Sequence, residues 1–334
     1  MDSVAAVDVA VVIPNYNGAR WLPGVLASVA EQITAPADVL VVDDGSTDGS
    51  LALLGERFPD VRVLALGANG GFARAANAGI AAVSAEAIAL VNTDVVLAPD
   101  WIARAVAALA GAPRAAAVAT KLVDFEDPTL LYDAGDVLRR DGASEQRGRF
   151  ERDTGRYDAP GEVFSACAGA ALYRRSAVLE TGGFDERFGT YLEDVDLGLR
   201  LRMAGWRCRW EPRCVARHAG GGSSMALHHG PGAWVQRNTL LLVARAFPAR
   251  WLHLVAYRQA AWAWHAARAG ELRAHLAGTR MALPLLPTFL RERRRLRARA
   301  AVPIDEAVPP RPIRGPRAGG HPSGHARRQQ PGAP

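Results

Sequence analysis

The sequence has little cysteine, with three in 334 residues. Cys167, Cys208 and Cys214 are odd in number and lack the spacing of a metal site. This pattern excludes a disulfide framework and predicts a reduced, cytoplasmic protein. The first residues, MDSVAAVDVAVVIPNYNG, also lack the basic start and long apolar core of a signal peptide.

Long apolar runs without charge are missing as well. The best candidate, Thr239–Ala267, is interrupted by Arg245, Pro248, Arg250 and Arg258. A membrane-spanning helix needs about 20 consecutive, mainly apolar residues. The sequence therefore predicts a protein that is soluble or bound peripherally to a membrane.

Acidic residues do not balance the basic ones near the C-terminus. The formal net charge is +6, and six arginines cluster there: Arg291, Arg293, Arg294, Arg295, Arg297 and Arg299. Such a cluster suits an anionic surface such as a membrane, and we expect no nucleic-acid partner. The alternative is a solvated helix face that leads into a tail.

What the sequence does contain is a regular alternation of apolar strands and amphipathic helices. Hydrophobic residues make up 49% of the chain, enough for a large folded core. We expect strands at Val9–Ile13, Asp38–Val42, Val61–Leu66, Ala87–Val91 and Ala115–Ala119, and helices at Trp21–Ala30, 49–58, Phe72–Val83 and Pro99–Leu109. This order predicts an α/β fold with a mostly parallel sheet flanked by helices.

The second half is less regular. Residues 121–160 are rich in Asp, Gly, Arg and Tyr and predict irregular hairpins over the sheet. A helix is expected at Glu193–Met203 and short strands at Trp206–Trp210 and Cys214–Ala216. Residues 234–299 are expected to be mainly helical, and those after Pro303 to be disordered.

Polar clusters fall where three of the predicted strands end. They are Pro14–Gly18, Asp43–Asp44 and Asn92–Asp94; a fourth cluster, Glu193–Asp196, begins a helix. Each alone is more simply explained as a cap or turn. In a parallel sheet, however, the first three meet at one edge, where open α/β sheets bind ligands.

A nucleotide-binding dehydrogenase is a rival hypothesis. It would require G-x-G-x-x-G after the first strand, whereas the sequence reads PNYNGARW. A polymer synthase would require several membrane-spanning helices, which the sequence does not predict.

Six motifs, taken in order, resemble the family 2 glycosyltransferases of GT-A (Rossmann-like) fold, especially bacterial rhamnosyltransferase- and galactofuranosyltransferase-like members. They are VVIPNYNG, VVDDGSTDGS, NGGFARAANAG, LVNTDVVL, GGFDERFGTYLEDVDLGLRLRMAGW and VARHAGGGSS. The resemblance covers roughly the first three quarters of the chain and implies a catalytic domain at 1–230. The sequence pattern adds a helical C-terminal region at 231–300, expected to face membrane or acceptor, and a disordered tail at 301–334.

The resemblance also implies a divalent cation, Mg²⁺ or Mn²⁺. Asp94 matches the family's acidic DXD position, although Asn92 replaces the first aspartate of that motif. His218 matches a histidine that ligates the metal in some relatives. Carboxylate oxygens suit both ions, and imidazole favours Mn²⁺.

The donor site implied by the resemblance lies along the same strand ends. Asp44 matches the carboxylate that accepts the imide N–H of uracil or thymine, while Asp43 holds the turn. Arg74 is placed like a residue that contacts base or diphosphate, and the alternative is a salt-bridged surface arginine. The other expected contacts to the nucleotide sugar come from Pro14, Tyr16, Asn17, Asn77, Asn92 and Thr93, with Asn77 holding the same loop as Arg74.

Asp194, with Glu193 beside it, is the expected catalytic pair. An acceptor hydroxyl needs a base as its C–O bond forms. Glu193 and Asp196 are expected to raise the proton affinity of Asp194. The alternative is that these carboxylates only favour a helix N-terminus.

The resemblance thus implies a metal-dependent, inverting enzyme that moves a sugar, rhamnose first, from a dTDP- or UDP-sugar to a glycan or lipid-linked acceptor of the cell envelope. We expect it in the cytoplasm, peripheral at the inner face of the membrane. The alternatives are a UDP-sugar-dependent galactofuranosyl- or glucosyl-type transferase and a catalytically silent, membrane-associated protein that binds nucleotide sugars.

Overall fold

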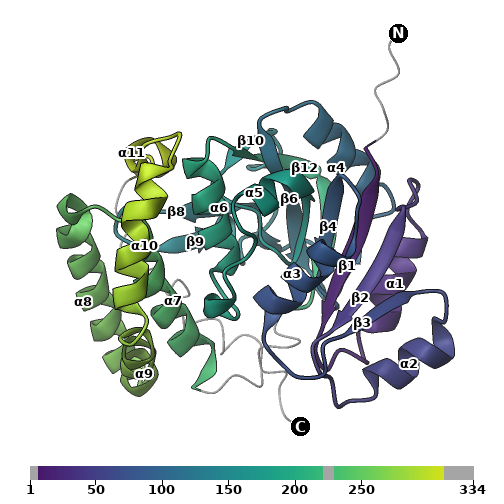
Figure 1. The fold of residues 1–334 in the computed structure, drawn as a ribbon, viewed down its shortest axis with the longest axis horizontal. Helices are drawn as coiled ribbons and strands as arrows, with labels where there is room; N and C mark the ends of the chain where they lie inside the picture. Colours follow the sequence, from purple (N-terminus) through teal and green to yellow (C-terminus); the bar gives the residue numbers. More distant parts are fainter. Residues whose placement is uncertain (1–6, 221–228, 312–334) are drawn as a thin grey trace.

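The computed structural model describes residues 7–220 and 229–311, which contain one large mixed sheet (Figure 1). The order across the large sheet is β10 (Gly161–Val163), β12 (Arg207–His218), β6 (Ala115–Asp124), β11 (Ala170–Arg174), β4 (Ala87–Val91), β1 (Val9–Asn15), β2 (Asp38–Asp43) and β3 (Arg62–Ala65). Two short strands also belong to it: β5 (Val95–Leu97) pairs with β12, and β7 (Leu131–Asp133) pairs with β6. Strands β8 (Asp136–Leu138) and β9 (Ser144–Gln146) form a separate hairpin.

The direction of the strands decides where their ends lie. Strands β3, β2, β1 and β4 run parallel to one another. Strand β11 is antiparallel to both β4 and β6, so β6 runs with β4, and β12 is parallel to β6. The carboxyl ends of β1, β2, β4 and β12 therefore share one edge, which confirms the prediction made for the first three.

Helices cover both faces of this sheet. Apolar side chains of α1 (Leu22–Ala30), α2 (Ser50–Arg57) and α4 (Trp101–Ala110) pack on one face. Those of α3 (Phe72–Ala82), α5 (Arg175–Glu180) and α6 (Glu193–Met203) pack on the other. Helix α3 lies so close to β1 that a Cβ added at Gly79 would lie 2.3 Å from Val12 Cγ1.

The C-terminal helices share a core with the rest of the protein. They gather beyond α6, on the left of Figure 1. Phe188, Val195, Leu199 and Met203 belong to the same buried cluster as side chains from these helices. The helices are α7 (Gly230–Ala246), the short η3 (Ala249–Trp251), α8 (Leu252–Arg268), α9 (Leu272–Ala282), α10 (Leu286–Ala298) and α11 (Ile304–Ala307).

Two strands are longer than expected. Strand β6 continues from Ala119 to Asp124, and β12 joins the two short strands predicted around Trp210 and Ala216 into one. Pairing with β6 holds β12 together across an irregularity between Glu211 and Val215, which hides the strand from the sequence pattern.

The expectation that disorder begins at 301 is wrong for residues 301–311. Val302, Ile304, Ala307 and Val308 are buried, and the Val302 amide donates to the Met203 carbonyl of α6 at 3.0 Å. Apolar burial thus fixes this segment despite its prolines. The rest of the predicted tail, 312–334, lies outside the described residues.

None of the helices within 7–220 and 229–311 is long and apolar enough to cross a bilayer.

Candidate active site

The first two polar clusters meet where β1 and β2 end. Asn15 pairs with Asp43 in the sheet register, and the Asn15 Nδ2 donates to Asp43 Oδ2 at 2.7 Å and to Ser46 Oγ at 3.0 Å. The Asp43 carboxylate also accepts the Ser46 amide at 2.9 Å. Asp43 therefore holds the turn after β2.

Asn17 binds these two loops together. It adopts a positive φ of 52°, and its Oδ1 accepts the Thr47 amide at 2.8 Å. Asn17 is thus already engaged in shaping the turn. Pro14 is buried within β1, whereas Tyr16 is half-buried in the loop that follows.

The third cluster lies beside the first. A Cβ added at Gly18 would lie 2.3 Å from Asn15 Oδ1 and 3.1 Å from the Thr93 side chain. Only glycine fits this approach, which brings the β1 loop against the loop after β4. The strand ends converge as the parallel arrangement requires.

Asp44 holds a neighbouring loop rather than standing alone. Its carboxylate accepts the amides of Gly70 at 2.9 Å and Gly71 at 2.7 Å, and lies 3.4 Å from Arg74 Nη1. Burial raises the pKa of Asp44, although these donors oppose it. Asp44, at the end of β2, therefore fixes the 68–71 turn that lies between β3 and α3.

Arg74 binds the same turn. Its guanidinium donates to the carbonyl of Ala68 at 2.7 Å, and 36% of its side chain is exposed. Both predicted roles for Arg74, ligand contact and surface ion pair, are compatible with this placement.

Asn77 does not hold the loop of Arg74. Its Nδ2 donates to the Phe184 carbonyl at 2.8 Å, and its Oδ1 accepts the Phe184 amide at 2.9 Å. Asn77 lies about one turn after Arg74 on α3 and faces the segment before η1 (Glu186–Phe188). Its side-chain amide forms two hydrogen bonds with the backbone of that segment.

Asp94 and His218 lie side by side. Asp94 directly precedes β5, whose Val95 pairs with His218 of β12, and Asp94 Oδ1 is 3.2 Å from His218 Nε2. Both side chains are buried, and the Tyr132 ring packs against the imidazole with centroids 4.2 Å apart. Residues 124 positions apart in sequence thus form one polar pair.

The polar atoms of the Asp94–His218 pair and of the neighbouring Asn92 suit a divalent cation. Asn92 Oδ1 and His218 Nδ1 are buried and have no hydrogen-bond partner within the described residues. Those residues contain no group of three or more His, Cys, Asp or Glu side chains able to hold a metal. Two protein ligands nevertheless fit an ion that takes its remaining oxygens from phosphate and water, as Mg²⁺ does.

One short segment, Ala168–Gly169, contacts both Asp194 and the surroundings of the Asp94–His218 pair. The Ala168 amide donates to Asp194 Oδ2 at 3.1 Å. The next residue, Gly169, accepts the Asn92 amide at 2.8 Å, and a Cβ added there would lie 3.3 Å from His218 Cε1. The fourth cluster therefore joins the others.

The environment of Asp194 raises its pKa, as expected, but for a different leading reason. Burial is the main cause, and the amides of Ala168 and Val195 oppose it. Asp196 forms ion pairs with Arg200 at 2.8 Å and Arg245 at 3.0 Å instead of facing Asp194. Glu193 is buried, and its own pKa is raised by burial and by Asp194.

The sequence analysis missed two buried carboxylates near Asp194. Asp133 and Asp136 come from β7 and β8, and Asp136 Oδ2 accepts the Ser165 hydroxyl at 2.8 Å. Burial raises the pKa of Asp133 to about 7 and also raises that of Asp136. The signal was two carboxylates among apolar residues in LYDAGDV, within a region treated as irregular hairpins.

Comparison with known families decides what this arrangement belongs to. The model of the family described as "Glycosyl transferase family 2" matches residues 10–182, which contain the carboxyl ends of β1, β2 and β4. The chain belongs to this family. It is therefore a glycosyltransferase with the GT-A fold.

Named relatives agree with this assignment. The N-acetylglucosaminyl-diphospho-decaprenol L-rhamnosyltransferase of Mycobacterium tuberculosis is 33% identical over 233 residues, which cover 62% of this chain and 75% of that protein. The pre-mycofactocin glycosyltransferase of the same species is 32% identical over 220 residues, 63% of this chain and 42% of that one.

Solved structures share the fold. GalNAc-T7 with UDP, GalNAc and Mn²⁺ has a TM-score of 0.59 and 15% identity, over 74% of this chain and 49% of that chain. Residues 1–349 of S. aureus TarS with UDP-GlcNAc have a TM-score of 0.56 and 17% identity, over 88% and 84% of the two chains.

Proposed function

We propose that this glycosyltransferase moves a sugar, with inversion, from a nucleotide-diphosphate sugar to a hydroxyl of a lipid-linked acceptor. The observation that carries the proposal is the Asp94–His218 pair at 3.2 Å, which the Ala168–Gly169 segment joins to Asp194. One face of the site can thus hold a diphosphate while the other receives an alcohol.

Asp94 and His218 would hold the divalent cation, Mn²⁺ or Mg²⁺. When bound, that ion neutralises the charge that grows on the departing diphosphate. Arg74, whose side chain is partly exposed, adds positive charge at the neighbouring turn. Asp44 and Asn17 serve the donor site by fixing the loops around it, with Tyr16 available to stack on the base.

Asp194 is the proposed base. The Ala168 amide fixes one oxygen, and the raised pKa brings the carboxylate closer to the working range of a general base. The acceptor oxygen bonds to the sugar carbon as its proton passes to Asp194 and the nucleoside diphosphate leaves. The buried Glu193, next to Asp194 in the sequence, is the second member of the proposed catalytic pair.

Rhamnose is the first sugar proposed, because the Mycobacterium tuberculosis relative is named as an L-rhamnosyltransferase. The diphospho-decaprenol in the same name supports a lipid-linked acceptor. Such an acceptor would place the reaction at a membrane. We therefore also propose that this glycosyltransferase is cytoplasmic and acts at the inner face of the membrane. UDP-sugars are the second candidates, supported by the UDP-GlcNAc complex of TarS.

A donor panel tests the proposal. Purified protein is incubated with dTDP-rhamnose, UDP-sugars or GDP-mannose, a polyprenyl-diphosphate-linked GlcNAc acceptor and Mn²⁺ or Mg²⁺. We expect sugar transfer that chelation abolishes and that Asp94→Asn reduces at least tenfold. The exposed Asp60→Asn is the matched control and should transfer at the wild-type rate.

Transfer that persists in chelator would remove the metal assignment. If every donor failed while nucleotide sugars still bound in calorimetry, the silent, nucleotide-sugar-binding alternative would replace the enzyme.

A further inference from the structure

The arginines of α10 divide into two groups. Arg293 donates to the carbonyls of Ala244 at 2.8 Å and Val243 at 3.3 Å, and Arg297 donates to Ala246 at 3.0 Å. These carbonyls lie at the end of α7, where orphan acceptors attract basic side chains. Arg293 and Arg297 therefore fasten α10 to α7.

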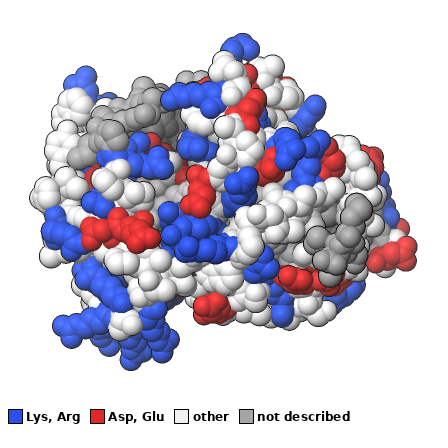
Figure 2. All heavy atoms as spheres, turned by 90° about the horizontal axis from the view of Figure 1, so that it is seen from above, with Lys and Arg blue, Asp and Glu red and all other residues white. Residues whose placement is uncertain are grey.

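The second group has no such task. The side chains of Arg294, Arg295 and Arg299 are exposed and form no hydrogen bond or ion pair with the described residues, while the Arg291 guanidinium bonds only to Pro287 and Thr288 of its own helix. Figure 2, which views the molecule from above, shows Lys and Arg side chains gathered at the lower left, on the side of the molecule where α10 lies. These cations are available to a partner.

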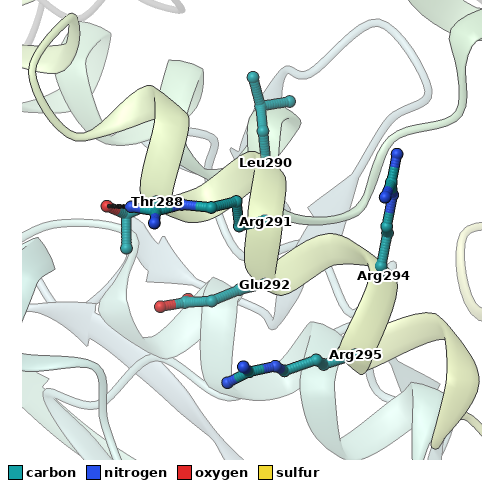
Figure 3. Close-up of a pocket in the computed structure, with 6 residues that line it drawn as sticks. All are labelled: Thr288, Leu290, Arg291, Glu292, Arg294 and Arg295. Atoms are coloured by element: carbon teal, nitrogen blue, oxygen red, sulfur yellow. Dashed lines mark hydrogen bonds between the residues drawn. The ribbon is translucent and has the colours of Figure 1, made fainter.

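Three of these cations, Arg291, Arg294 and Arg295, line a groove of about 680 Å³. In Figure 3, Arg291, Glu292 and Arg295 point to one side of α10, and Arg294 points away from them. The lining residues are Thr288, Leu290, Arg291, Glu292, Arg294 and Arg295.

The single acid in this groove does not neutralise it. Glu292 is the only acidic residue between Leu272 and Pro303. Its two oxygens accept Arg187 Nη1 and Nη2, each at 2.8 Å. The negative charge of Glu292 is thus paired with Arg187, so the three arginines that line the groove leave it positively charged.

Leu290 lines the groove with these cations, and two further leucines of the α9–α10 hairpin are exposed. Leu283, between α9 and α10, is 56% exposed, and Leu290 on α10 is 47% exposed. Leu276 on α9, seven residues before Leu283, is 43% exposed. Basic side chains beside apolar ones are the composition of a surface that lies in the lipid headgroup region. A nucleic acid would gain nothing from the leucines.

We propose that the α10 groove and its flanking leucines form a docking surface for an anionic lipid bilayer. Charge complementarity favours acidic headgroups, and the leucines enter the boundary with the acyl chains.

A network of ion pairs gives this docking a consequence for catalysis. Arg187 joins Glu292 of α10 to Asp185, and Arg245 of α7 joins Asp185 to Asp196. Asp196 lies on α6, two residues after Asp194. These ion pairs therefore connect the docking surface to the helix that carries the proposed base, and we expect docking to orient the active site towards the bilayer. This last consequence rests on the proposed function; the docking itself does not.

Vesicle flotation of the full chain tests the docking. We compare wild type with the triple variant Arg291→Gln, Arg294→Gln, Arg295→Gln on phosphatidylcholine vesicles with and without phosphatidylglycerol. Each basic residue near an anionic surface contributes roughly fivefold to binding, so the triple variant should bind about a hundredfold more weakly. Leu283→Ser with Leu290→Ser should also weaken binding, with the salt dependence unchanged.

The control removes the same charge elsewhere. Arg57→Gln, Arg62→Gln and Arg156→Gln together change exposed arginines away from α10 and should leave binding at the wild-type level. Equal binding by wild type and the α10 variant would overturn the proposal. So would a wild type that binds polyphosphate or DNA but no anionic vesicles.

Transfer to a water-soluble acceptor separates the two proposals. The α10 variant should retain the wild-type rate there, because its substitutions lie outside the site. Loss of vesicle binding with intact transfer concerns docking alone, whereas vesicle binding without transfer would contradict only the proposed function.

Discussion

Asp185 shows how a single buried carboxylate can carry part of the stability. It lies between Arg187, at 2.6 Å, and Arg245. Burial alone would raise its pKa, but the two guanidinium groups outweigh that effect and hold the pKa at about 2, below the ordinary 3.8. The charged form is therefore favoured by folding.

Replacing this carboxylate should destabilise the protein in a pH-dependent way. A depressed pKa contributes stability that is present above pH 3.8 and is lost as the pH falls towards 2. We expect Asp185→Asn to lower the free energy of unfolding at pH 7 by about 2–4 kcal/mol, since it also leaves arginines unpaired. Urea denaturation at several pH values measures the difference.

The gap between wild type and variant should narrow below about pH 4. The exposed Asp38–Arg62 pair gives the control, and Asp38→Asn should cost less than about 1 kcal/mol. A gap for Asp185→Asn that stayed constant with pH would show that its charge is not the cause.

At the scale of elements, α6 meets the segment that fixes Asp194 at a glycine. A Cβ added at Gly198 would lie 2.4 Å from Ser165 Cβ and 3.4 Å from the Phe164 carbonyl oxygen. Ser165 is also the hydroxyl donor to Asp136, and the same segment continues to Ala168, whose amide holds Asp194. Close packing here positions the proposed base.

Gly198→Ala should therefore affect catalysis more than binding. We expect the helix to be displaced, at a cost of about 1–3 kcal/mol in stability, with kcat lowered and the donor Kd unchanged. Denaturation, calorimetry and steady-state kinetics measure the three quantities. Gly55→Ala is the control, because a Cβ at Gly55 meets nothing within 4 Å. Equal losses in both variants would refute the packing argument.

The elements also show where prediction from sequence succeeds. The sequence predicts the strand ends at Ile13, Val42 and Val91, where apolar runs stop at polar residues, and the structure ends these strands within two residues, at Asn15, Asp43 and Val91. The partner of Asn77, by contrast, is Phe184, 107 positions away, and no local pattern predicts such a contact. The irregularity in β12 concealed one continuous strand for the same reason, since only pairing with β6 reveals it.

Over the whole molecule, parallel strands decide the site more than any single motif. They bring Asn15, Asp43 and Asp94 to one edge, and β12 delivers His218 there. This convergence follows from the α/β alternation and was predictable. The contribution of Asp133 and Asp136 was not, because it depends on how the 121–160 hairpins fold over the sheet.

The central claim is that Asp194 removes the acceptor's proton beside a separately held donor. The most direct test is Asp194→Asn, assayed by calorimetric titration with the donor and by single-turnover transfer. The account predicts an unchanged donor Kd with a rate at least a hundredfold lower, since a general base contributes about 10²–10⁴-fold. A variant that binds donor normally and transfers sugar at the wild-type rate would contradict it.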